Sequence, residues 1–224
     1  NTNGTYSSDD YARDLDSARG YGAIASNNSW SMNDIDGWST SYTNGGFNAT
    51  EFQAVVDANP SYSASQLYGY LFESGASGSV NSDATAAVDL YITALNNFQD
   101  SGVIVFASGN SNEESDVSLM GGLPEFFSQL AEAWISVGLI DFTGDNIAGA
   151  TESEFTLHGN KCGSAKEYCV VADGYQLNGG GWVDGSTHWY ETGGSGSSYS
   201  APMVSGGIAL LAQAFPNHTP EQLT

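Results

Sequence analysis

A segment rich in glycine and serine, residues 194–206, holds side chains that could perform nucleophilic chemistry. A serine hydroxyl is a poor nucleophile unless it is positioned and deprotonated by a neighbouring base. Ser198 directly precedes an apolar stretch, residues 201–215, that we predict to be a helix. At a helix N-terminus the free amides and the dipole favour the negative charge that develops in acyl transfer. The alternative is a flexible loop before a core helix.

A second segment, residues 102–110, is an apolar run that ends in Ser108-Gly109-Asn110. A continuous apolar run of this length is typical of a buried parallel strand. A carboxamide at the end of such a strand could donate a hydrogen bond to a developing oxyanion. The other interpretation is that Gly109 and Asn110 form an ordinary turn after a strand.

These two motifs, in this order, resemble the subtilisin-like serine peptidases, the subtilase family. Gly196-Ser197-Ser198-Tyr199-Ser200-Ala201-Pro202 is similar to the family signature Gly-Thr-Ser-x-Ala/Ser-x-Pro, with Ser197 where the family usually has Thr. The resemblance implies that Ser198 is the nucleophile and that Asn110 donates its side-chain amide to the oxyanion hole.

Residues 25–30 are similar to the family strand that forms one wall of the primary specificity pocket. The resemblance therefore implies substrate-binding roles for Ser29 and Trp30, with Ser108 and Gly109 on the opposite wall. Strand edges on both sides would bind an extended peptide through backbone hydrogen bonds. Ser31 replaces the usual Gly, and Trp30 could instead be an ordinary core aromatic.

Cys162 and Cys169 are the two cysteines of the chain. So close together they could form a disulfide, half of a metal site or two free thiols, and we favour a small disulfide loop in an oxidising compartment. Residues 160–174 also resemble the passenger domains of bacterial subtilisin-like autotransporters, with Asp173 in place of a Pro. That resemblance implies a structural Cys162–Cys169 disulfide and a secreted or cell-surface bacterial protein.

The general base is the part of the chemistry that these residues do not supply. In subtilases the order along the chain is Asp, His, Ser, yet the histidines here, His158, His188 and His218, all follow Asn110. His188 is near Ser198 in sequence and could approach it, but we favour surface or packing roles for all three. We therefore expect the Asp and His to precede Asn1. The alternative is a degenerate subtilase that acts as a non-catalytic surface or adhesion module.

The composition limits the partners. Four basic residues stand against 26 acidic ones, and the net charge is −22. Such a surface repels nucleic acid and anionic membranes, and we find no apolar run of the roughly 20 residues that span a bilayer. We expect a peptide or protein substrate, the upstream part of the catalytic domain as a partner, no metal ligands and no required cofactor. Calcium is implied only by the resemblance, and the candidate oxygen ligands are Asp9-Asp10, Asp34/Asp36 and Asp141/Asp145.

The elements that must position these side chains alternate between strands and helices, which predicts an α/β fold with a parallel sheet and helices on both faces. We interpret residues 1–224 as part of one subtilisin-like catalytic domain that is incomplete at both ends. The part that bears Asp and His is expected before Asn1, and Thr219-Pro220 starts a last helix that is cut short at Thr224. The elbow Gly-x-Ser-x-Gly of α/β-hydrolases and a dinucleotide-binding Gly-x-Gly-x-x-Gly are not found. The predicted strands are 21–25, 102–107, 134–140 and 168–172, and the predicted helices are 51–58, 64–73, 82–100 and 201–215.

Overall fold

A computed structural model describes residues 7–30, 47–73, 79–144, 147–183 and 187–224. Its centre is a mostly parallel sheet in which β1 (Ala25–Asn28), β2 (Val103–Ala107), β3 (Trp134–Phe142) and β5 (Cys169–Asp173) are neighbours in that order. β4 (Phe155–Leu157) pairs with β3 in the antiparallel direction. The predicted α/β fold with a parallel sheet is confirmed.

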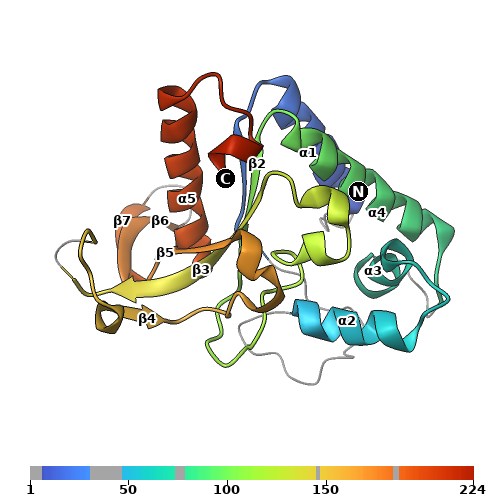
Figure 1. The fold of residues 1–224 in the computed structure, drawn as a ribbon, viewed down its shortest axis with the longest axis horizontal. Helices are drawn as coiled ribbons and strands as arrows, with labels where there is room; N and C mark the ends of the chain where they lie inside the picture. Colours follow the sequence, from blue (N-terminus) through green and yellow to red (C-terminus); the bar gives the residue numbers. More distant parts are fainter. Residues whose placement is uncertain (1–6, 31–46, 74–78, 145–146, 184–186) are drawn as a thin grey trace.

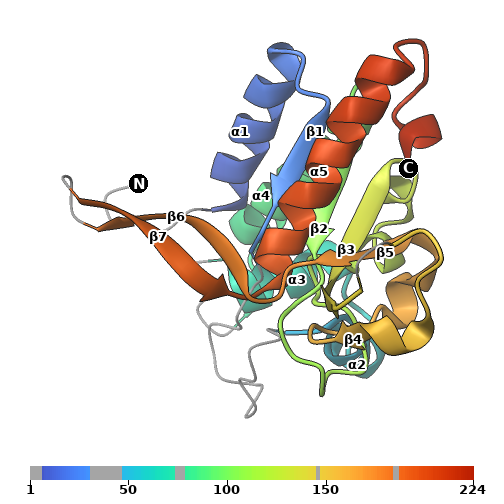
Figure 2. The same ribbon diagram turned by 90° about the vertical axis from the view of Figure 1, so that its left-hand side faces the viewer.

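Helices cover both faces of this sheet (Figure 1). One face carries α1 (Ser8–Gly20), α3 (Ala64–Phe72) and α4 (Ser82–Gln99), with α2 (Ala49–Ala58) beside them. The other face carries α5 (Ser197–Ala214). Figure 2 shows α5 lying across β1, β2 and β3, while the hairpin of β6 (Leu177–Val183) and β7 (Thr187–Gly194) extends away from the sheet.

The alternation of side chains along β2 explains the two layers, since successive residues of a strand point to opposite faces. Ile104 and Phe106 belong to the large core under α1, α3 and α4, where Phe106 stacks on Trp134 with ring centroids 5.0 Å apart. Val103, Val105 and Ala107 belong to the core under α5. All five side chains are buried, as expected for a strand covered on both faces.

Two predicted elements differ from the observed ones at their starts. The strand predicted at 21–25 is instead β1, which begins at Ala25, because α1 ends at Gly20 and Tyr21-Gly22 form the turn that follows it. Tyr21 is 93% exposed, which no buried strand residue would be. Helix α5 begins at Ser197, earlier than predicted, so Ser198 lies in its first turn. The helix α1 itself was not predicted.

The remaining predicted elements agree with the structure to within two residues. Asn81 caps α4 by accepting hydrogen bonds from Asp83 N and Ala84 N, and Ser63 caps α3 in the same way through Gln66 N. The start signal at Thr219-Pro220 leads into a short 3₁₀ turn, Glu221–Leu223. None of the described helices is long and apolar enough to cross a membrane.

The packing of Phe106 gives a test of this core. Because Phe106 is fully buried between Trp30 and Trp134, Phe106→Ala leaves a cavity and should lower the free energy of unfolding by about 3–5 kcal/mol. Leu90→Ala is the control, since Leu90 on α4 is 57% exposed and its loss should cost less than about 1 kcal/mol. Urea denaturation of both variants measures the difference, and equal losses would contradict this description of the core.

Candidate active site

Ser198 lies where the N-terminus of α5 meets the carboxyl end of β1. Its Oγ donates to the main-chain oxygen of Ser29 at 3.3 Å, and the Ser29 Oγ donates to the main-chain oxygen of Ser198 at 3.2 Å. The second bond has a cause in the helix. Pro202 has no N–H to bond the carbonyl four residues earlier, and that carbonyl belongs to Ser198. Ser29 supplies the missing donor and so holds the helix start against β1.

Asn110 lies beside the same helix start, at the end of β2. Its Oδ1 accepts hydrogen bonds from the main-chain N of Ser197 at 2.7 Å and from the Ser197 Oγ at 2.9 Å. The Ser197 Oγ in turn accepts from the main-chain N of Gly109 at 3.2 Å. Since a main-chain N–H can only donate, the amide atom that faces it must be the oxygen. The amide nitrogen of Asn110 is therefore directed away from Ser197.

Two N–H donors remain available at this point. Within the described residues, neither Nδ2 of Asn110 nor the main-chain N of Ser198 has a hydrogen-bond partner. The N–H of Ser198 is free because the first turn of a helix has no earlier carbonyl to bond. The Asn110 Oδ1 lies 3.5 Å from the place where a Cβ on Gly196 would be, and the Asn110 Nδ2 and the main-chain N of Ser198 each lie 3.6 Å from it. The absence of a side chain at residue 196 therefore leaves space next to both N–H groups.

Ser197 is a residue of this candidate site that the sequence did not single out. It is only 1% exposed, and its hydroxyl and main-chain N link β2 to α5 through Asn110. The available signal was its place immediately before Ser198, where the family usually has Thr. A hydroxyl is the property that Ser and Thr share, and the hydroxyl is what bonds Asn110.

The predicted substrate-binding residues do not all lie at the surface. Trp30 packs into the core under α1, stacked on Tyr11 with centroids 4.6 Å apart. Ser108 is fully buried, and its Oγ has no hydrogen-bond partner within the described chain. Its main-chain N and O bond Val137 and Ser118, so these groups are already used internally. Of the four residues, Ser29 and Gly109 contact the start of α5, and the substrate-binding roles stay predictions.

Two of the histidines pack against aromatic side chains. His158 stacks on Tyr175 with ring centroids 3.8 Å apart, and His218 packs against Phe215 at 5.0 Å. His188 lies on β7, and its main chain pairs with Trp182 of β6; its side chain lies outside the described part of the structure.

The acidic candidates for calcium do not gather in the described structure. Within those residues there is no group of three or more His, Cys, Asp or Glu side chains that could hold a metal ion. Asp10 caps α1, where the hydrogen bond donated by the main-chain N of Ser7, followed by that of the Arg13 guanidinium, lowers the pKa of its carboxyl. Ser31 and the candidate ligands Asp34, Asp36 and Asp145 lie outside the described residues.

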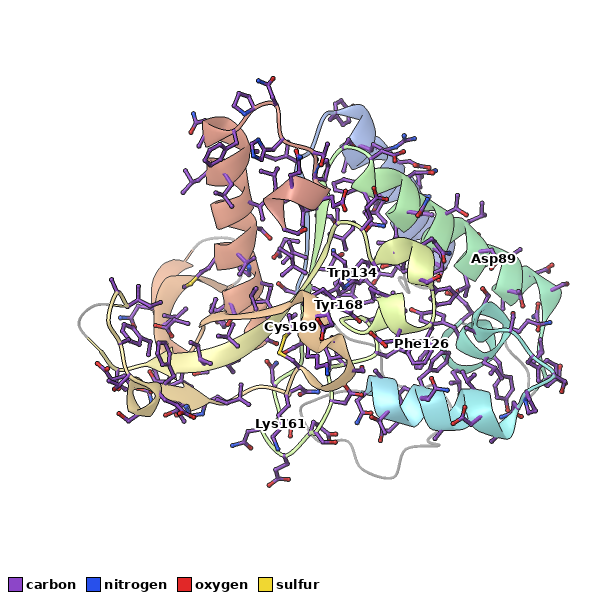
Figure 3. All side chains as sticks on the ribbon, in the orientation of Figure 1. Asp89, Phe126, Trp134, Lys161, Tyr168 and Cys169 are labelled. Carbon is purple, nitrogen blue, oxygen red and sulfur yellow. A yellow bond between two sulfur atoms is a disulfide. The ribbon has the colours of Figure 1, made fainter. Side chains whose placement is uncertain are left out.

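Cys162 and Cys169 form the disulfide that the resemblance implies. The bond closes a short loop, Gly163–Tyr168, and brings the chain to the start of β5 (Figure 3). Tyr168 in this loop donates to Glu125, and burial followed by this hydrogen bond raises the pKa of its hydroxyl well above the usual value. The disulfide therefore ties this loop to the start of β5.

Comparison with known proteins now adds to this geometry. A sequence profile described as "Peptidase_S8: Subtilase family" matches residues 1–224. The chain belongs to the subtilase family. This subtilase is 28% identical over 123 residues to serotype-specific antigen 1 of Mannheimia haemolytica, a match that covers 54% of the chain and 12% of the relative.

Solved structures agree on the fold of this subtilase. Sphericase matches with a TM-score of 0.53 and 16% identity, over 96% of the chain and 53% of the sphericase chain. The prenylagaramide maturation protease PagA matches with a TM-score of 0.51 and 15% identity, over 97% and 55% of the two chains. The chain thus spans about half the length of the solved structures and about an eighth of the curated relative that it matches.

Gly109 gives a test of how tightly this site is built. Its φ of +114° is unfavourable for any side chain, and a Cβ there would overlap the amide of Asn160. Gly109→Ala should therefore lower the free energy of unfolding by about 1–3 kcal/mol. Gly206→Ala makes the same chemical change at an exposed position of α5 with open space around it, and should raise that free energy by about 0.8–1 kcal/mol. Thermal denaturation of both proteins would reveal the opposite signs, and a neutral effect at Gly109 would contradict the described backbone.

Proposed function

We propose that this subtilase is a serine endopeptidase whose acyl-enzyme forms on Ser198. The observation that supports the proposal is that the Ser198 main-chain N and the Asn110 Nδ2 lack hydrogen-bond partners among the described residues and both border the space beside Gly196, at the helix start that bears the Ser198 hydroxyl. The Oδ1 of Asn110 is occupied by Ser197, so the nitrogen faces the region next to the nucleophile. This arrangement is what stabilisation of a tetrahedral oxyanion requires.

In the proposed reaction the Ser198 Oγ attacks the scissile carbonyl carbon, and its proton passes to a histidine. Asn110 Nδ2 and the Ser198 N–H bind the oxygen that becomes negative. The histidine then protonates the amine as the C–N bond breaks, and water releases the acid from the acyl-enzyme by the reverse sequence of proton transfers. We propose that the histidine and its aspartate come from sequence outside these 224 residues. The chemistry requires no cofactor.

The substrate and location are proposed on the same basis. Family membership implies a peptide substrate, and we propose that it binds in an extended conformation beside Ser29 and Gly109. The disulfide and the likeness to serotype-specific antigen 1 support a secreted or cell-surface location in a bacterium, as in autotransporter passenger domains. Arg13, Arg19 and Lys166 form ion pairs with acidic side chains nearby in sequence.

A fluorophosphonate probe tests the nucleophile. The full-length protein should be labelled, and Ser198→Ala should abolish the labelling, because the neighbouring Ser197 hydroxyl is buried and donates to Asn110. Ser195→Ala is the matched control: Ser195 is an exposed serine of the same segment whose Oγ accepts from Gln176 N, and labelling should persist. Labelling that survives Ser198→Ala would disprove the assignment. A full-length protein that resists the probe would favour the non-catalytic surface module.

Peptide hydrolysis tests the oxyanion donor. Asn110→Ala should lower kcat by about 10²–10³-fold, the loss known for the equivalent change in a subtilisin, with KM little changed because the hydrogen bond strengthens only in the transition state. Asn59→Ala, which removes an amide that bonds Val55 at the end of α2, should leave both constants unchanged. An unaltered kcat in Asn110→Ala would remove Asn110 from the mechanism.

A further inference from the structure

Asn160 is a fully buried amide that lies directly behind the loop bearing Asn110. It belongs to the segment between β4 and the disulfide loop, in which the neighbouring Lys161 points away from the molecule (Figure 3). A buried amide costs free energy unless its donors and acceptor are satisfied. Asn160 satisfies them on the Asn110 loop and nowhere else among the described residues.

Three hydrogen bonds from Asn160 hold this loop. Its main-chain N donates to the Gly109 oxygen at 3.2 Å, and its Oδ1 accepts from the Ser111 N at 3.0 Å. Its Nδ2 donates to the Asp116 oxygen at 3.1 Å. The first two bonds lie on the two sides of Asn110, so the backbone of residue 110 is fixed from both directions. The Asn160 amide also fills the space beside Gly109 that a side chain would otherwise occupy.

The far end of the loop is anchored independently. The Asp116 carboxylate is 4% exposed and accepts from Ser164 N at 2.8 Å, from Ser164 Oγ at 3.0 Å and from Thr50 Oγ1 at 2.7 Å. Ser164 belongs to the disulfide loop. The segments before and after Cys162 therefore both form hydrogen bonds with the loop that bears Asn110. Of Asn160 and Ser164, it is Asn160 that bonds the residues next to Asn110.

We propose that Asn160 is a positioning residue for the oxyanion hole, a role that rests on the proposed function of Asn110. Ser197 orients the Asn110 side chain through hydrogen bonds to its Oδ1, and Asn160 fixes the backbone through hydrogen bonds to Gly109 and Ser111. Donors that stabilise an oxyanion act because they are held in place before the reaction, and a displacement of about 1 Å can cost on the order of 100-fold in rate. Asn160 thus acts on the transition state through Asn110, without contacting substrate.

A double-mutant cycle in the full-length protein tests this role. Asn160→Ala should lower kcat for a peptide substrate by about 10–100-fold with KM changed by less than about 2-fold, since only transition-state binding is affected. In the Asn110→Ala background the same substitution should lower kcat by less than about 2-fold, because the donor that Asn160 positions is already gone. A purely structural role predicts equal losses in both backgrounds, and that result would overturn the proposal.

Two further variants make the test decisive. Asn160→Asp keeps the acceptor for Ser111 N, and burial favours its neutral form, whose O–H can still donate to the Asp116 oxygen. It should fold if Asn160→Ala does not, and show a smaller kcat loss with the same dependence on Asn110. Asn48→Ala is the matched control, because Asn48 is a buried amide, 5% exposed, that bonds Glu114 on the same loop and does not bond Asn110 or its neighbours among the described residues. It should lower stability and leave kcat unchanged; a kcat loss as large as that of Asn160→Ala would overturn the proposal.

The outcomes separate the two proposals. If Asn110→Ala leaves kcat unchanged, the oxyanion assignment fails and the role of Asn160 fails with it. If Asn110→Ala slows the reaction but Asn160→Ala raises KM alone, or acts equally in both backgrounds, the proposed function stands and only the positioning role is overturned.

Discussion

The candidate site depends on one interaction, the pair of hydrogen bonds that Ser197 donates to a single oxygen of Asn110. These bonds join the end of β2 to the first turn of α5, and they also decide which atom of the Asn110 amide accepts from Ser197. Because Ser197 is buried, water does not compete for its hydroxyl and the orientation is maintained. Loss of this contact would leave Asn110 an exposed side chain free to rotate.

The start of α5 lacks one helical hydrogen bond, and a residue outside the helix replaces it. Proline inside a helix removes a hydrogen bond and is costly, yet Pro202 lies in the second turn of α5, four residues after Ser198. The carbonyl that it leaves unpaired is bonded by Ser29 from β1. Ser198 is therefore held by Ser29 on one side and by the contact between Ser197 and Asn110 on the other. The segments that follow β1 and β2 therefore both help to position Ser198.

Much of the fold could be predicted because its central strands are buried on both faces. Apolar runs such as Val103–Ala107 are required by that burial, so they are visible in the sequence. Strand β1, with sequence ASNN, is only partly buried and polar, and its start was wrongly predicted. Helix α1 was missed for a similar reason, since Ala12 and Leu15 are its only buried apolar residues. The capping box of Ser7 and Asp10 was the signal that could have revealed it.

The sequence by itself determined the strand that leads to Asn110, most of the helix that begins at Ser197 and the family resemblance, because these depend on local patterns and short motifs. Only the tertiary structure decided that the Asn110 oxygen faces Ser197, that Trp30 packs partly buried against Tyr11 of α1, and that Asn160 bonds both neighbours of Asn110. These contacts join residues 19 to 87 positions apart in the chain. The direction of a hydrogen bond between such residues depends on how the layers pack, and no local pattern records it.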